Sequence, residues 1–249
     1  MASSPLPFRD ERPIAAVPRA LLVVFALALG AQVAWRAMQP APTAAADQLT
    51  MPPSSAALRV LAIGDPIALG QLLTLRLQAF DNQPGISVPF AALDYNRVEA
   101  WLAAILDLDP RTGYPLLMAA QLYGQVFGHP DKQRQMSEFV LRQFLRDPDR
   151  RWQPLAHVAV MAKHRLHDLP LALRYAKALE QHARGPGVPG WARQMHIFLL
   201  EDLGEVETAK VLLGGLLASG AITDEHEARF LTERLQALEN AENSTGLPR

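Results

Sequence analysis

The sequence predicts an all-α protein in which an N-terminal transmembrane helix precedes an α-solenoid of paired helices. Residues 20–35 form an uncharged apolar run. After residue 54, helix-ending and helix-starting residues recur at short intervals, and several markers return every 38 or 39 residues. Helix–turn–helix units with a period in the thirties are typical of α-solenoids. No run of alternating Val, Ile and Thr is present, so we expect no sheet.

The first element is the apolar run, which we place in a transmembrane helix over residues 19–38. Twenty helical residues span about 30 Å, which matches the hydrocarbon core of a bilayer. Arg9, Arg12 and Arg19 precede the run and only Arg36 follows it closely. The positive-inside rule therefore places the tail of residues 1–18 in the cytoplasm. In a bacterium the C-terminal domain would lie in the periplasm, held at the inner membrane. A cleaved signal peptide is the alternative.

A linker is predicted over residues 39–53, because Pro and Ala dominate there without an apolar period. The helical-repeat domain is predicted over residues 54–240, and a disordered tail over residues 241–249. The motif Gly64-Asp65-Pro66 combines a helix stop, an N-cap and a first-turn proline. Similar signals predict helices at about 66–80, 94–108, 114–127, 131–146, 152–166, 170–183, 189–203, 205–219 and 224–240. The long segment 81–93 is expected to cover the open end of the array or to contact a ligand.

The predicted helices form similar pairs. Asp109-Pro110 and Asp147-Pro148 lie 38 residues apart, and Tyr114, Trp152 and Trp191 open successive first helices. The segment DYNRVEAWLAAILDLDP, residues 94–110, resembles the second helix and closing Leu-Asp-Pro of a tetratricopeptide repeat, and GEVETAKVLLGGLL, residues 204–217, is similar to the same helix. This resemblance implies repeat units at roughly 66–110, 114–148, 152–186 and 189–220, with a capping helix at 224–240. Another family of helical pairs stays an alternative.

The resemblance also implies that the first helices line a concave groove that binds an extended peptide or a partner helix. The implied groove positions are Tyr114, Leu117, Gln121 and Gln125; His157, Met161, His164 and Arg165; and Trp191, Gln194, Phe198, Glu201 and Asp202. Their spacing keeps each set on one helix face. Met161 and Phe198 also fit a core, and Trp152 and Trp191 fit contacts between adjacent units. The cations around His164 also fit a solvated helix end.

Composition and motifs exclude several classes of function. The chain has 249 residues, 24 basic and 25 acidic, and no cysteine. Nucleic-acid binding therefore has no electrostatic support, and disulfides and zinc–thiolate sites are excluded. No nucleophile elbow, phosphate-binding loop, dinucleotide fingerprint or His-Glu-x-x-His motif occurs. We expect neither an enzyme nor a cofactor. His157 and His164 are seven residues apart, so no metal site is expected there either.

These observations predict a single-pass membrane protein of the anchored bacterial tetratricopeptide-repeat type. Residues 19–38 would bind the lipid bilayer, and the concave face would bind a protein or peptide. The expected role is a scaffold or chaperone in the cell envelope, and this link rests on architecture. The alternative is a structural membrane module that self-associates into a homo-oligomer.

Overall fold

The computed structural model describes residues 17–39, 46–220, 222 and 224–245. The chain divides into two units, residues 1–45 and residues 46–249. The predicted cytoplasmic tail, residues 1–18, lies outside the described residues except for Val17 and Pro18. Each unit is considered separately below.

The first unit contains one long helix, α1 (Arg19–Met38), with the bounds that the sequence predicts. Pro18 precedes the helix, Arg36 lies in its last turn, and none of its side chains is buried. The helix is long enough and apolar enough to cross a membrane. The prediction of one such helix near the N-terminus is confirmed, while its topology and compartment stay predictions.

The second unit is helical apart from one small hairpin, so the all-α class is confirmed over the described residues. Its α-helices are α2 (Ser55–Leu61), α3 (Pro66–Gln78), α4 (Tyr95–Leu108), α5 (Tyr114–Leu117), α6 (Pro130–Phe144), α7 (Trp152–His164), α8 (Leu169–His182), α9 (Gly190–Asp202), α10 (Val206–Ala218) and α11 (Glu225–Thr245). The expected N-caps form, since Asp65 Oδ1 accepts from Ala68 N at 2.9 Å and Asp168 Oδ1 accepts from Leu171 N at 3.0 Å.

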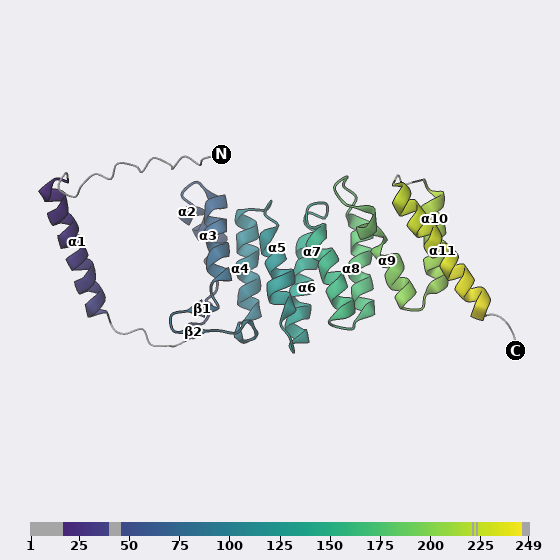
Figure 1. The fold of residues 1–249 in the computed structure, drawn as a ribbon, viewed down its shortest axis with the longest axis horizontal. Helices are drawn as coiled ribbons and strands as arrows, with labels where there is room; N and C mark the ends of the chain where they lie inside the picture. The colour runs from purple at the N-terminus through teal and green to yellow at the C-terminus, as the bar shows by residue number, and fades with distance from the viewer. Residues whose placement is uncertain (1–16, 40–45, 221, 223, 246–249) are drawn as a thin grey trace, which may run out of the picture. The chain divides into compact units, whose positions relative to one another are not determined.

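The helices of the second unit stand side by side in chain order, from α2 and α3 to α10 and α11 (Figure 1). Polar contacts between neighbouring pairs recur at sequence separations close to the predicted period. Examples are Tyr114–Gln78 at 36 residues, Gln135–Asn96 at 39, Tyr175–Glu138 at 37 and Arg234–Glu201 at 33. The period in the sequence is therefore also a period in the tertiary contacts.

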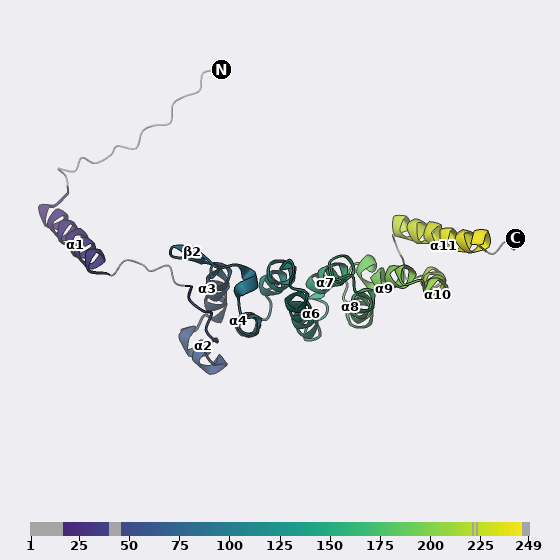
Figure 2. The same ribbon diagram turned by 90° about the horizontal axis from the view of Figure 1, so that it is seen from below.

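The buried apolar side chains form two clusters. The main core extends from Leu49 through α9 and contains Leu102, Phe139 and Tyr175. A second cluster joins α9, α10 and α11 through Ile197, Leu213 and Leu231, among others. Figure 2 shows α11 lying across α9 and α10 at the C-terminal end of the row. The last three helices therefore have a core of their own.

The predicted helix 114–127 differs from a continuous α-helix. It consists of α5, a π-helical turn η3 (Met118–Leu122) and a 3-10 turn η4 (Tyr123–Gln125). The Tyr95 hydroxyl donates to Tyr123 O at 2.9 Å, and the Tyr123 hydroxyl donates to Leu77 O at 3.1 Å. Because Tyr95 engages a carbonyl that a continuing helix would use, the helical ladder ends early.

The expectation that the chain forms no sheet is wrong in one segment. Residues 81–93 contain an antiparallel hairpin of β1 (Asn82–Gln83) and β2 (Ile86–Ser87), followed by a 3-10 turn η2 (Phe90–Ala92). The turn uses Gly85 at φ 79°. Two-residue strands are too short to produce an alternating pattern in the sequence. Phe90 meets Tyr123 edge-to-face, with ring centroids 5.5 Å apart, so the segment packs on the core.

The predicted linker 39–53 and tail 241–249 also differ from the structure. The second unit begins at Ala46, and Leu49 is buried in the main core. Arg97 donates to Leu49 O and Trp101 Nε1 donates to Thr50 O, both at 2.7 Å. Side chains of α4 therefore hold this extended segment in place, and the Pro- and Ala-rich composition of the segment does not predict these contacts. At the other end, α11 continues to Thr245, and residues 246–249 lie outside the described residues.

Candidate functional site

Four of the predicted groove residues line one cavity, which we call the first-helix pocket. The cavity has a volume of about 400 Å³ and lies between the α5–η3 segment and the start of α7. Tyr114, Leu117 and Gln121 come from the first of these segments and His157 from the second. Two helical segments from different predicted pairs therefore contribute to it.

Hydrogen bonds hold the walls of the first-helix pocket. The Tyr114 hydroxyl donates to Gln78 Oε1 on α3 at 3.1 Å. Gln125 Nε2 lies 3.3 Å from His157 Nε2. Burial lowers the pKa of His157 below its usual value. The imidazole is therefore held in its neutral form, in which it can donate one hydrogen bond and accept another.

Arg151 supports the pocket, and the sequence patterns did not single it out. Its side chain is buried at the start of α7. One guanidinium nitrogen donates to Gln143 O at 2.9 Å and Gln143 Oε1 at 3.1 Å, and the other donates to Pro110 O at 3.0 Å. Burial lowers the pKa of Arg151. The residue joins the end of α6 and the start of α7 to Pro110, which lies 41 residues earlier in the sequence.

The lining of the first-helix pocket contains two arginines, Arg150 and Arg151, beside the neutral His157, and the described lining residues include no carboxylate. Arg150 pairs with Asp147 at 3.0 Å outside the lining. With Tyr114 and Leu117 beside these groups, the pocket suits a side chain or chain end that carries oxygen acceptors next to an apolar part.

The other predicted residues of α7 do not line this pocket. Met161 is half-buried, and His164 and Arg165 are exposed where the helix ends. The neighbouring Lys163 forms an ion pair with Asp202 of α9. The exposure of His164 and Arg165 at the C-terminus of α7 matches the interpretation as a solvated helix end.

The predicted groove face of α9 contacts the chain itself. Trp191 meets Trp152 of α7 edge-to-face, with ring centroids 5.5 Å apart, as in the interpretation of contacts between units. Further along the face, three pairs connect α9 to α11: Gln194–Glu227, Phe198–Phe230 and Glu201–Arg234. The C-terminal helix therefore covers part of the face that the sequence assigns to the groove.

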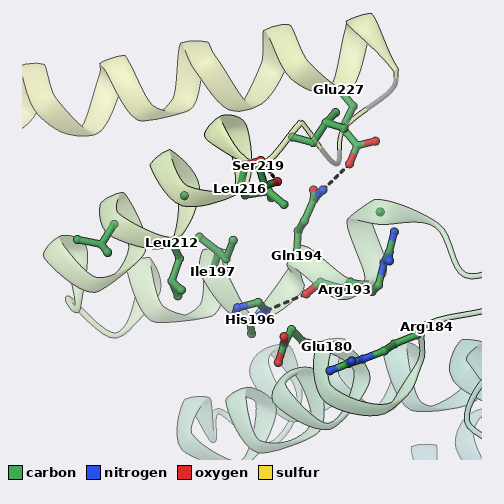
Figure 3. A pocket seen from close by; sticks show the side chains of 14 residues that line it. Glu180, Arg184, Arg193, Gln194, His196, Ile197, Leu212, Leu216, Ser219 and Glu227 are labelled. Carbon is green, nitrogen blue, oxygen red and sulfur yellow. Dashed lines mark hydrogen bonds between the residues drawn. The ribbon is translucent and has the colours of Figure 1, made fainter.

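A second cavity, the C-terminal pocket, has a volume of about 630 Å³ and lies among α8, α9, α10 and α11 (Figure 3). Its apolar wall comes from α9, from α10 and from the segment after α10, and its polar wall from the end of α8 and the loop after it, from α9 and from α11. The apolar group is Ile197, Val211, Leu212, Leu216 and Ile222, and the polar group is Glu180, Arg184, Arg193, Gln194, His196 and Glu227.

The polar wall of the C-terminal pocket is partly fixed by internal bonds. His196 Nδ1 lies 2.8 Å from Arg193 O, and burial lowers the pKa of His196. Gln194 donates to the Glu227 carboxylate, which also lies against Gly190 at the start of α9. Of this pocket the sequence predicted only Gln194. The pair Gly214-Gly215 in α10 is the one available signal, because a helix without side chains at such positions leaves space beside it.

No three histidine, aspartate or glutamate side chains gather to hold a metal ion within the described ranges. Comparison with known proteins finds no matching family model, no matching curated protein and no matching solved structure. The functional interpretation therefore depends on the residues and the geometry above.

Proposed function

We propose that this chain is a membrane-anchored helical-repeat scaffold or chaperone of the tetratricopeptide type, which binds a protein or peptide partner in the bacterial cell envelope. The observation that carries the proposal is the convergence of Tyr114, Leu117, Gln121 and His157 on one open cavity. These residues come from the first helices of two adjacent pairs, which is where repeats of this type take up peptides.

The stacking of the second unit supports the repeat assignment. The Trp152–Trp191 contact joins consecutive first helices, and the Tyr175–Glu138 bond joins consecutive second helices. These residue pairs are 39 and 37 positions apart, close to the repeat length of the family that the sequence resembles. A chain that repeats one helical pair in this way presents a long continuous surface instead of a closed pocket.

The membrane assignment is supported by α1 and the charges around it. The helix has no polar face, and Arg19 and Arg36 are its only charged residues. Arg9, Arg12 and Arg19 lie at or before its start, and this excess favours a cytoplasmic N-terminus and a periplasmic helical unit. A large surface for protein binding would then be held at the inner membrane.

The proposal is tested by site-specific photo-crosslinking of the full-length protein in the membrane of a bacterial host. A photoreactive residue replaces Gln121 in the first-helix pocket, and in a matched variant it replaces Gln181, which is exposed on α8 outside both pockets. We expect the Gln121 variant to capture a defined envelope protein, and we expect excess unlabelled chain to reduce this capture. The Gln181 variant should capture no such protein. Equal capture at both positions contradicts a binding role for the pocket.

The same experiment separates the scaffold from the self-associating alternative. If the Gln121 variant captures only copies of the chain, the structural module is the better description. A pull-down from cells that carry two differently tagged copies checks that outcome, because it recovers the second copy only when the chain self-associates.

A further inference from the structure

The N-terminal end of the helical row carries an exposed apolar surface, which we call the apolar elbow. It comprises the outward side chains of α2, α3 and the turn between them, where the two helices meet at 107°. Its members are Val60, Leu61, Ile63, Ile67, Leu72 and Leu75, all of them exposed. Ile63 at the apex is 92% exposed and Val60 is 79% exposed.

The elbow differs from the usual end of a helical array, whose outer face is polar. Helix α3 uses Gly70, Leu73 and Leu77 to pack inward. The opposite stripe of the same helix carries Leu72 and Leu75. Residues 51–80 include only three charged side chains, Arg59, Asp65 and Arg76. Taken together, α2 and α3 pass the same test of length and apolarity as α1. An exposed apolar surface of this kind indicates a site that contacts another protein or a membrane.

The apex of the elbow is unusual in its backbone as well. Ile63 has φ 48° and is followed by Gly64 at φ 88°. The left-handed region disfavours β-branched side chains. Asparagine or glycine would adopt this backbone conformation at a lower energetic cost in a turn that faces water. The chain instead places a large, almost fully exposed apolar side chain at this turn, which indicates a role for that side chain outside the fold.

The composition of the elbow favours a lipid surface as its occupant. Helices α2 and α3 together are long and apolar enough to enter a membrane, although they bend by 107° at the turn. An exposed apolar turn of this kind can enter the boundary between headgroups and acyl chains. Arg59 lies beside the turn, and its long stem can keep the charge among the headgroups, whereas Arg76 lies over the Trp101 ring, 5.6 Å from its centroid.

The short connection between α1 and the second unit also favours a membrane as the occupant of the elbow. Helix α1 ends at Met38, and the second unit begins at Ala46. Seven residues separate them, and eight fully extended steps reach roughly 28 Å. Residues 47, 49 and 50 are bonded to the second unit, so they cannot lengthen this tether. The tether therefore limits how far Ala46 can lie from a membrane that α1 crosses, and the elbow belongs to the first two helices of the second unit.

We propose that the apolar elbow inserts into the interfacial region of the same bilayer, so that the second unit docks on the membrane through Ile63 and its neighbours. This inference rests on the proposed anchoring of the chain by α1. Docking adds a second attachment point next to the tether. It would hold the row of helices in a defined orientation to the membrane, instead of leaving it to rotate freely.

The test uses the absence of cysteine from the chain. Single cysteines replace Ile63, Val211 or Leu27 in the full-length protein, and each carries an environment-sensitive fluorophore. Val211 is the matched control, because it is an apolar side chain of α10 that is 73% exposed. Leu27 reports on α1. The proteins are reconstituted into vesicles of phosphatidylcholine and phosphatidylglycerol, with or without lipids that carry a quenching nitroxide below the headgroup.

We expect the fluorophore at position 63 to emit at shorter wavelength in vesicles and to lose most of its emission to the nitroxide lipid. The fluorophore at position 211 should show neither change. Quenching at 27 without quenching at 63 overturns the docking proposal and leaves the anchor intact. The absence of quenching at both positions overturns the anchor and the docking together. A blue shift at 63 without lipid quenching shows that protein covers the elbow, which also contradicts the proposal.

Discussion

Single polar side chains join the helical pairs of this protein. Asp149, in the turn before α7, accepts from Arg184 N at 2.8 Å and from Gly185 N at 2.6 Å. A Cβ at Gly185 would lie 2.7 Å from Asp149 Cγ, so this close approach requires glycine. Arg151, two residues later, bonds to Gln143 and Pro110. One short turn therefore contacts both the preceding and the following pair.

The variant Asp149→Ala should lower the free energy of unfolding by about 1–2 kcal/mol, because two amide donors lose a charged acceptor. Gly185→Ala should have a similar effect by displacing the same carboxylate. Urea unfolding of the full-length protein in detergent micelles measures both. Gln181→Ala, which truncates another exposed side chain, is the control. The interpretation fails if Asp149→Ala and the control have equal stability.

His157 and His196, both partly buried, predict a dependence of stability on pH. Burial lowers the pKa of His157 and of His196 in the folded protein, while both rings have a pKa of about 6.5 in the unfolded chain. The unfolded chain therefore binds more protons below about pH 6.5, so stability is complete above this value and is lost as pH falls. Unfolding midpoints at about pH 7.5 and about pH 5.5 measure the loss. The double variant His157→Gln, His196→Gln should lose less stability over this interval; an unchanged difference would contradict the assignment.

Individual helices differ in how they are supported. The segment α5–η3–η4 changes its helical pitch within a dozen residues, because Tyr95 and Gly124 shape its end. Helix α11 closes the C-terminal end of the row by covering α9 and α10. Its contacts Gln194–Glu227 and Phe198–Phe230 occupy predicted groove positions. A binding surface on the first helices would therefore be most accessible at α5 and α7.

The variant Gly124→Ala should destabilise the protein by about 1–3 kcal/mol, because overpacking forces the backbone to shift. A Cβ at this position would lie 2.8 Å from Ala119 O. Gly214→Ala in α10 is the matched control, since a Cβ there meets nothing within 4 Å. That control should stabilise the helix by roughly 0.5–1 kcal/mol. Thermal unfolding compares the two variants, and a change of the same sign in both would contradict the close contact at Gly124.

The second core cluster predicts that α9–α11 open as a separate cooperative unit. Leu231 is fully buried in this cluster, and its truncation to alanine should cost about 2–5 kcal/mol. Hydrogen exchange with mass spectrometry should show faster exchange in α9, α10 and α11 and unchanged exchange in α4 and α6. Leu179→Ala, a truncation of similar size in the main core, should instead accelerate exchange in α7 and α8. Uniform acceleration by both variants would show that the row unfolds as one unit.

The complete chain combines one apolar helix with an extended helical unit on a short tether. Helix α1 contributes no buried side chain to the described structure, whereas the second unit buries its own two cores. Seven residues lie between Met38, where α1 ends, and Ala46, where the second unit begins. Both proposals for this protein follow from that combination: a binding surface held at a membrane, and an apolar end that meets the bilayer.

The orientation of the whole chain is testable with a membrane-impermeant thiol reagent. In bacterial spheroplasts, a cysteine at Val211 should be labelled without lysis, because the positive-inside rule places the helical unit in the periplasm. A cysteine at Ser4, in the N-terminal tail, should be labelled only after lysis. The reversed pattern would place the helical unit in the cytoplasm and contradict the proposed localisation.

Local chemistry accounts for what could be predicted from the sequence. Aspartate caps, first-turn prolines and the glycines Gly64 and Gly204 define helix ends through short-range bonds, and the uncharged run defines α1. Spacing placed Tyr114, Leu117 and Gln121 on one helix face, and the resemblance to a repeat family implied that His157 lines the same groove. These features involve residues within one turn or one period.

Contacts between distant segments decided the rest. Nothing near Leu49 or Thr50 in the sequence indicates that Arg97 and Trp101 hold them, and the composition of α11 does not reveal that it covers Gln194 and Phe198. The C-terminal pocket arises from four helices at once, and the exposure of Leu72 and Leu75 depends on which face of α3 packs against α4. Periodicity tells which side chains share a face, but only the packed structure tells what that face meets.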